Sequence, residues 1–125
     1  MIKLDHMAMY VHDLENMKNF FVHFFSAQAN QIYYNPKTGL RTYFLTFADG
    51  SRLEIMNRPE VLIQEKERFL SGYTHIVFSV GSKEVVDDLT HLLENNGYTV
   101  ISGPWKTGDG YYESCIQGPE NNLMK

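Results

Sequence analysis

The N-terminal quarter of the chain reads as one strand followed by one helix. From residue 2 to residue 11, hydrophobic and polar positions alternate as in a strand, and one face carries Ile2, Leu4, His6, Ala8 and Tyr10. The alternation places His6 in the middle of this strand. Asp13 is suited to an N-cap, and apolar residues then recur every three to four positions to Phe25, which predicts an amphipathic helix.

Three shorter strands are expected next, over residues 31–34, 41–47 and 52–57. The dipeptide Asp49-Gly50 separates the last two, and it suits a tight turn because glycine accepts a positive φ. Those two strands should therefore pair in an antiparallel manner. Residues 58–72 carry mixed charge without a strand pattern, which is typical of a linker.

The pattern of a strand, a capped helix and further strands then repeats in the second part of the chain. A strand over residues 73–80 is followed by a helix that Ser82 caps, with a predicted buried stripe of Val85, Val86, Leu89, Leu92 and Leu93. Strands over 98–102 and 111–117 follow, separated by a turn-rich segment at 103–110.

Histidine opens the hydrophobic strand segment in both parts of the chain. His75 follows His6 by 69 residues, about half of the 125-residue chain, and each segment precedes a capped helix. The sequence therefore predicts an α+β fold of two βαβββ modules, at 1–57 and 73–125, in a single domain spanning 1–125. A pseudo-twofold axis would bring His6 and His75 to equivalent places around a shared cavity.

Composition narrows the classes of function. Hydrophobic residues make up 43% of the chain, which supplies a core, and the net charge of −4 lacks any long run of one sign. Nucleic acid is therefore not an expected partner. Cys115 is the single cysteine, and no apolar stretch reaches the roughly 20 residues that span a bilayer. These features predict a soluble cytoplasmic protein without membrane partners.

Two histidines at repeat-equivalent positions point to metal binding more strongly than a single histidine in an apolar strand. Glu54 lies in a third strand segment, where it shares a face with Arg52 and Met56. Neutral imidazole and carboxylate together suit Zn²⁺, Ni²⁺, Mn²⁺ or Fe²⁺. Taken alone, Glu54 fits a solvated strand face better than a ligand position. In the company of His6 and His75 it becomes a candidate third ligand of a divalent metal.

These motifs, in this order, make the chain resemble the glyoxalase I and fosfomycin-resistance superfamily, also called vicinal oxygen chelate proteins. The resemblance covers essentially all 125 residues, and it rests on the Phe-rich helix and on residues 5–11, 52–56, 72–80 and 118–123. It implies a cupped mixed sheet with the helices outside and a homodimer. It also assigns the three metal ligands to His6, Glu54 and His75.

The family pattern also implies a second glutamate ligand from the last strand of module two. Counting along the motif places Lys125 there, and a protonated lysine does not bind metal. Three readings stay open: a site with three protein ligands, impaired metal affinity, or replacement by Glu113. As an isolated residue, Glu113 is also compatible with an exposed strand position.

The activity that the resemblance implies is chemistry on a small substrate whose two neighbouring oxygens chelate the metal. A lactoylglutathione lyase-like reaction is the first hypothesis, with Glu54 as the base and Glu113 as the second candidate. The expected pocket residues are Arg41, Met56, Tyr111 and Tyr112.

Two other functions fit the same residues. Two histidines and one glutamate suit an Fe²⁺-dependent dioxygenase, although extradiol members usually carry four modules. A metal-free protein that sequesters an aromatic drug, like the bleomycin-resistance relatives, is favoured by Lys125 and the high Tyr and Phe content. Cys115 lies in an apolar strand and is expected to be a small buried side chain rather than a nucleophile.

Overall fold

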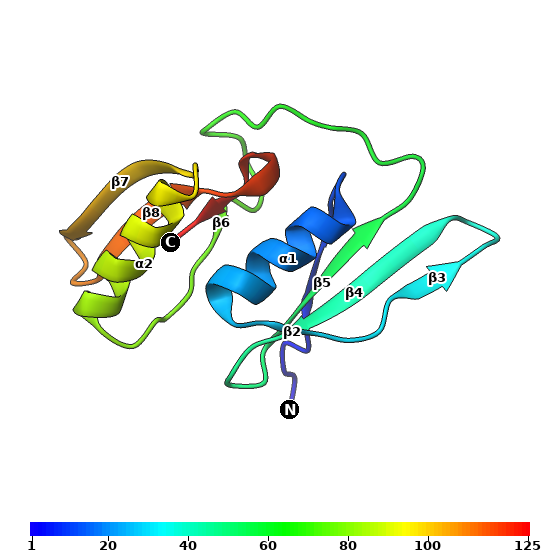
Figure 1. The fold of residues 1–125 in the computed structure, drawn as a ribbon, viewed down its shortest axis with the longest axis horizontal. Coiled ribbons are helices and arrows are strands. Elements are labelled where there is room, and N and C mark those ends of the chain that lie inside the picture. Colours follow the sequence, from blue (N-terminus) through cyan, green and yellow to red (C-terminus); the bar gives the residue numbers. More distant parts are fainter. The chain divides into compact units, whose positions relative to one another are not determined.

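A computed structural model describes residues 1–125. The chain divides into two compact units, Met1–Gln64 and Glu65–Lys125, which we call the first half and the second half. Each half combines one sheet with one long helix that lies on one face of that sheet (Figure 1). The predicted α+β class is therefore confirmed.

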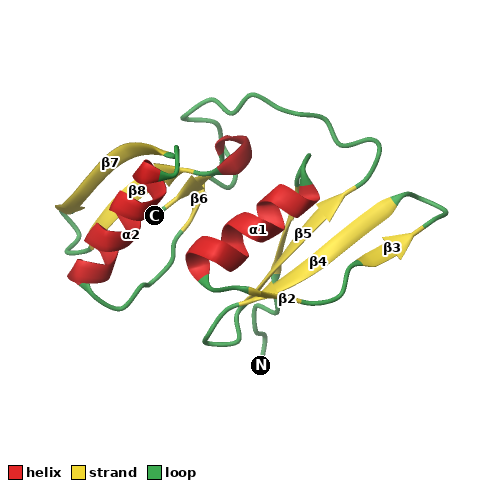
Figure 2. Ribbon diagram, viewed as in Figure 1, coloured by secondary structure: helices red, strands yellow, loops and turns green.

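The sheet of the first half is built around two long antiparallel strands. β4 (Leu40–Thr46) pairs with β5 (Arg52–Asn57), and β1 (Met7–Tyr10) pairs in parallel with the other edge of β5. β2 (Gln28–Ala29) and β3 (Tyr33–Asn35) both pair with β4, one after the other along its length. The half thus has the predicted order, with β3 at the predicted second strand and β2 as an additional short strand before it (Figure 2).

Helix α1 (Leu14–Phe25) covers one face of this sheet. The side chain of Asp13 accepts a hydrogen bond from the backbone N–H of Asn16, which confirms the predicted N-cap. The face of the sheet that α1 covers carries Tyr43, Leu45, Leu53 and Ile55, all of them buried. The alternate positions of β4 and β5 form the opposite face, which we call the open face of the first half.

The second half has a four-stranded sheet and the order βαβββ. β6 (His75–Ile76) pairs in parallel with β9 (Leu123–Met124), and β9 pairs in an antiparallel manner with β8 (Tyr112–Gln117). β7 (Thr99–Lys106) lies on the other side of β8, and α2 (Lys83–Asn95) covers one face of the sheet.

Helix α2 begins as predicted but buries fewer of its apolar residues. Ser82 caps it by accepting a hydrogen bond from the backbone N–H of Val85. Within the predicted stripe only Leu93 is buried, whereas the side chains of Val85 and Leu92 are 42% and 45% exposed. Thr90 of α2 is buried and makes a polar contact with the sheet, since its hydroxyl group lies 2.7 Å from that of Ser114 in β8.

The first strand of each half is shorter than the alternation predicts. β1 begins at Met7, so His6 precedes the strand instead of lying in its middle. The regular pairing with β5 starts at Met7 and Leu53, although β5 itself begins at Arg52. β6 contains two residues of the predicted 73–80, because β9 offers only two partners. Periodicity does not report how far the pairing between two strands extends, so it could not predict either limit.

β7 continues through the segment that glycine and proline predict as a turn. It reaches Lys106 and shows register shifts against β8 around Ser102, and the Gly103-Pro104 peptide bond is cis. Gly103 has a φ of 78°, and a Cβ there would lie 2.5 Å from the carbonyl oxygen of Glu113. Glycine at this bulge therefore lets the two strands approach closely.

A short turn over residues 118–122 joins β8 to β9. The backbone N–H of Gly118 donates to the carbonyl oxygen of Asn122 at 2.8 Å, and Glu120 has a positive φ of 58°. The Lys66 ammonium donates to the carbonyl oxygen of Glu120 at 2.8 Å and to Oδ1 of Asn122 at 2.7 Å. These contacts hold the turn that fixes the register between the two strands. Neither helix is long and apolar enough to cross a membrane.

Candidate metal centre

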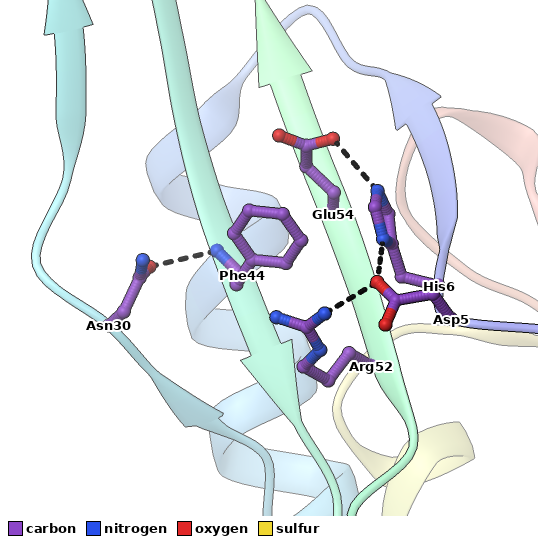
Figure 3. A network of polar contacts seen from close by, with 6 residues as sticks. All are labelled: Asp5, His6, Asn30, Phe44, Arg52 and Glu54. Atoms are coloured by element: carbon purple, nitrogen blue, oxygen red, sulfur yellow. Dashed lines mark hydrogen bonds and ion pairs between the residues drawn. The ribbon is translucent and has the colours of Figure 1, made fainter.

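His6 and Glu54 come together on the open face of the first half. Glu54 pairs with Ala8 in the parallel ladder, and His6 lies two residues before Ala8, so both side chains point to the same side. Nε2 of His6 lies 3.5 Å from Oε1 of Glu54. A dashed line joins the two side chains in Figure 3. Their side chains are 32% and 17% exposed, so both remain accessible to a small ion.

The spacing of these two atoms is suited to a shared metal ion. Nitrogen and oxygen ligands at about 2.0–2.2 Å from a tetrahedral Zn²⁺ are about 3.3 Å apart, which is close to the distance between Nε2 and Oε1. Both groups are ligands of divalent transition metals. His6 and Glu54 therefore fit as two of the ligands of such a site.

Asp5 lies on the other side of the His6 ring. Its Oδ2 is 2.7 Å from Nδ1 of His6 and also 2.6 Å from a guanidinium nitrogen of Arg52 (Figure 3). The hydrogen bond with His6 and then the nearby positive charge of Arg52 lower the pKa of Asp5 below its ordinary value. Asp5 is therefore a carboxylate at neutral pH.

The ring of Phe44 lies beside these groups on the same face. It meets the imidazole of His6 edge to face, with ring centroids 5.0 Å apart and an interplanar angle of 79°. The guanidinium carbon of Arg52 is 4.8 Å from the centroid of Phe44. The backbone N–H of Phe44 donates to Oδ1 of Asn30 at 2.8 Å, which ties this strand to the preceding loop (Figure 3).

In the second half, His75 lies on the face of the sheet that α2 leaves uncovered. Tyr112 and Ser114 point toward α2, where they bond to Asp87 and Thr90. The alternate residues of β8, among them Gln117, therefore point to the other face. Gln117 pairs with Leu123, and Leu123 pairs with His75, so His75 lies on that face as well. This is the open face of the second half, and it also carries Glu113 and Cys115.

Lys125 belongs to the same open face. Its backbone N–H donates to the carbonyl oxygen of Ile76, and its carbonyl oxygen accepts from the N–H of Phe78, so it lies opposite Val77. Val77 follows His75 by two residues, as Ala8 follows His6. The ladder therefore agrees with the count along the sequence that put Lys125 in place of a glutamate.

Cys115 is buried, with 4% of its surface exposed. Burial raises the pKa of its thiol, with a smaller opposing effect from the positive charge of Lys125. A protonated buried thiol is a poor nucleophile, and this environment fits the small buried side chain that the sequence predicts.

The four predicted pocket residues are divided between the faces. Met56 lies on the open face of the first half, because it alternates with the helix-facing Ile55. Arg41 points to the helix side, where its guanidinium lies 5.4 Å from the ring centroid of Tyr34. Tyr112 is turned toward α2 through its bond to Asp87, and Tyr111 precedes β8 with 65% of its surface exposed.

Sequence reasoning missed the roles of Asp5, Arg52 and Phe44 around His6. Two signals were present: a carboxylate directly before the predicted ligand, and an arginine two residues before Glu54 and thus on its face. Within each half, no group of three His, Cys, Asp or Glu side chains gathers in a way that could hold a metal ion. The first half by itself offers two donors, His6 and Glu54.

The amino-acid sequence matches one family model and is similar to one protein of Bacillus subtilis. The family model described as Glyoxalase/Bleomycin resistance protein/Dioxygenase superfamily matches residues 3–125. An uncharacterized protein of Bacillus subtilis, YqjT, is 28% identical over 121 residues, which cover 94% of this chain and 91% of that protein.

Several solved structures share the fold. A glyoxalase family protein from Bacillus cereus has a TM-score of 0.82 at 17% identity, over 99% of this chain and 91% of that one. Glyoxalase I of Leishmania major has a TM-score of 0.78 at 15% identity, over 99% and 84%. A mutant of the fosfomycin resistance protein FosX from Listeria monocytogenes, complexed with Mn(II) and dihydroxypropylphosphonic acid, has a TM-score of 0.76 at 24% identity, over 99% and 90%.

Proposed function

Because the chain belongs to the Glyoxalase/Bleomycin resistance protein/Dioxygenase superfamily, we propose that it is a metal-dependent, glyoxalase-like lyase or isomerase. Its substrate would be a small molecule with two neighbouring oxygen atoms, and the reaction would resemble that of lactoylglutathione lyase. The two oxygens would bind the metal together, which is the reason for preferring a substrate of this kind.

The observation that carries this proposal is the pairing of Nε2 of His6 with Oε1 of Glu54 at 3.5 Å on an open sheet face. We propose His75 as the third ligand, and Zn²⁺, Ni²⁺, Mn²⁺ or Fe²⁺ as the ion. The similar FosX mutant is complexed with Mn(II) and a diol-bearing phosphonic acid, which supports a divalent metal and a substrate with neighbouring oxygens.

In this proposal the protein residues bind the substrate and move one proton. A bound divalent cation would supply Lewis-acid stabilisation of the negative charge that develops on an oxygen next to the reacting carbon. Glu54 would accept the proton of that carbon at its carboxylate and return it to the neighbouring carbon, with Glu113 as the alternative base. The rings of His6 and Phe44 would exclude water from one side of the reacting carbon, and Met56 would add an apolar contact.

Metal titration tests the ligand assignment. Purified, metal-free protein is titrated with Mn²⁺, Ni²⁺ and Zn²⁺ by calorimetry, in parallel with His6→Gln, Glu54→Gln and His75→Gln. We expect near-stoichiometric binding by the unaltered chain and a large loss in each variant. The matched controls His23→Gln and His91→Gln replace exposed histidines of the two helices and should bind as the unaltered chain does. Absence of binding by the unaltered chain would refute metal dependence.

An activity assay tests the chemistry separately. The adduct of a 2-oxoaldehyde with a thiol carries the neighbouring oxygens that the proposal requires, and its isomerisation produces a thioester that is followed by absorbance. Several thiols should be compared, because no residue identifies the thiol part. Metal binding without turnover of any adduct would keep the metal site and reject the lyase activity.

A metal-free protein that sequesters a small molecule is the second candidate. Lys125 favours it, because a cation at the register position equivalent to that of Glu54 opposes metal binding. In that case, the protein would bind an aromatic compound with equal affinity before and after chelator treatment. The two functions are therefore separated by the effect of chelation on ligand affinity.

We also propose that the protein is a homodimer. Large apolar side chains are highly exposed on the single chain, with Leu62 at 86%, Phe69 at 88% and Tyr73 at 94%. Where such side chains lie together, apolar surface of this kind marks protein–protein interfaces. Light scattering should give twice the chain mass of 14.5 kDa, and a monomeric mass at assay concentration would contradict the proposal.

A further inference from the structure

We infer that Asp5 and Arg52 act as a pair of positioning residues, which hold the His6 imidazole with its proton on Nδ1 and leave Nε2 free beside Glu54. The inference deepens the proposed function. It rests on that function for one point, namely that Nε2 would bind a metal ion. It rests on the contacts of Asp5, Arg52, His6 and Phe44 (Figure 3).

The first step is the shared oxygen of Asp5. Oδ2 lies at hydrogen-bond distance from both Nδ1 of His6 and a guanidinium nitrogen of Arg52. A carboxylate only accepts hydrogen bonds, so the neutral imidazole must present an N–H at Nδ1. Its lone pair is then on Nε2, the nitrogen nearest to Glu54.

The second step is the way in which Arg52 fixes the carboxylate. Arg52 lies in β5 and Asp5 lies 47 residues earlier, so their contact ties the segment before β1 to the neighbouring strand. The guanidinium also lies against the ring of Phe44, which in turn meets His6 edge to face. The four side chains thus form a closed ring of contacts, and the imidazole is held from two directions.

The third step shows that the Asp5–Arg52 pair is suited to positioning His6 rather than to stabilising the fold. The Asp5 side chain is 73% exposed, and an ion pair this exposed contributes little to the stability of a fold. Carboxylates that accept the second N–H of a metal-binding histidine instead set its tautomer and its ring orientation. Tautomer and metal affinity are therefore the quantities that the pair should control.

The second half provides an internal control. The residue before His75 is Thr74, and the residue aligned with His75 in the ladder is Leu123, where the first half has Asp5 and Arg52. Neither Thr74 nor Leu123 carries a charge. The tautomer of His75 should therefore be independent of the pair.

The test measures the imidazole nitrogens directly in the metal-free, full-length protein. Long-range ¹H–¹⁵N spectra at about pH 8, where imidazole is neutral, distinguish the two tautomers of each histidine. His6→Gln and His75→Gln identify the two sets of signals. We expect Nδ1–H to predominate at His6 in the unaltered chain. His6 should lose that preference in Asp5→Ala, which removes the acceptor, and lose part of it in Arg52→Met, while the His75 signals stay unchanged. Asp5→Asn removes the charge but keeps an oxygen that can accept from Nδ1–H, so it should retain part of the preference.

Metal affinity supplies the second readout. Titration with Zn²⁺ should show about a 10- to 100-fold loss of affinity in Asp5→Asn, which is the range measured for such partners of metal-binding histidines. Asp88→Ala removes an exposed carboxylate from α2 and should change neither tautomer nor affinity. A His6 tautomer that is the same in Asp5→Ala and in the unaltered chain would overturn the inference. If the tautomer shifts but no form of the protein binds metal, the positioning role stands and the proposed function fails.

Discussion

Lys125 occupies the register position in the second half that Glu54 occupies in the first. Glu54 lies opposite Ala8, two residues after His6, and Lys125 lies opposite Val77, two residues after His75. The repeat therefore places a carboxylate in one half and an ammonium group in the other at matching points of the two ladders. This difference leads to the first prediction.

Lys125→Glu should strengthen metal binding. The change removes a positive charge and supplies a further carboxylate, so we expect a gain in affinity of about tenfold, or ~1.4 kcal/mol. Competition with a chelator measures the gain. Lys125→Met removes the charge without adding a ligand, and Lys106→Glu makes the same charge change at the end of β7. Equal affinity in Lys125→Glu and Lys125→Met would show that residue 125 is not near the ion.

Phe21→Ala should be among the most destabilising single changes in the first half. Phe21 is fully buried, and its ring lies 5.3 Å from that of Phe20 and 6.3 Å from that of Phe47. Removing such a ring leaves a cavity and costs about 3–5 kcal/mol. Urea denaturation followed by circular dichroism measures the loss. Val22→Ala, at a neighbouring position that is 40% exposed, should change stability by less than about 1 kcal/mol.

Gly103→Ala should disturb the pairing of β7 with β8. Gly103 has a positive φ, and an added Cβ would approach the backbone of Glu113 and Ser114 at 2.5 and 2.9 Å. The left-handed conformation alone costs a residue with a side chain about 1–2 kcal/mol, and the close contacts add to it. Thermal unfolding should therefore show a clearly lower midpoint. Gly108→Ala is the control, because nothing lies within 4 Å of its added Cβ; equal midpoints would contradict the prediction.

The contact between Tyr43 and Glu15 should make stability depend on pH. The Tyr43 hydroxyl donates to Glu15 at 2.5 Å, and this bond, with the nearby Lys18, lowers the pKa of the carboxyl below its ordinary 4.5. Since the pKa is lower in the folded state, the stabilisation is present above pH 4.5. It is lost as the pH falls through the folded value.

The same hydrogen bond raises the pKa of Tyr43 above its ordinary 10.0. The stabilisation of the fold by the Tyr43 hydroxyl is therefore fully present below pH 10.0, and it is lost as the pH rises through the raised pKa of Tyr43. Tyr43→Phe should lower the midpoint of thermal unfolding most near neutral pH and progressively less toward pH extremes. Tyr33→Phe removes an exposed hydroxyl and serves as the control. A Tyr43→Phe effect that is constant from acid to neutral pH would refute the role of the ionised Glu15.

Local signals in the sequence were sufficient for the helices and for the order of elements. Asp13 and Ser82 cap the helices as their side chains predict, and β5 has its expected bounds. The lengths of β1 and β6 could not be predicted, because each depends on how far the pairing with a partner strand extends. Partner length depends on residues far away in the sequence.

The sequence indicated which residues form the candidate site more readily than what surrounds them. The family pattern grouped His6 with Glu54, and the structure brings their side chains together. The face of Arg41 could not be assigned, since this depends on which side of the sheet the helix covers. The ring of contacts through Asp5 and Arg52 joins residues 47 positions apart, and no local pattern reports such a contact.

The turn over residues 118–122 has a consequence for how this protein can change. Side chains of a strand alternate between faces, so one residue inserted into or deleted from the turn would slip β9 by one position. Lys125 would then point toward α2, and the buried Met124 would point to the open face. The insertion or deletion of a single codon would thus move the positive charge of Lys125 away from the open face of the second half. A point substitution at residue 125 changes the side chain at that position but leaves the faces of the strand as they are. The length of this loop is as strong a constraint on the chemistry of the second half as the residues at its end.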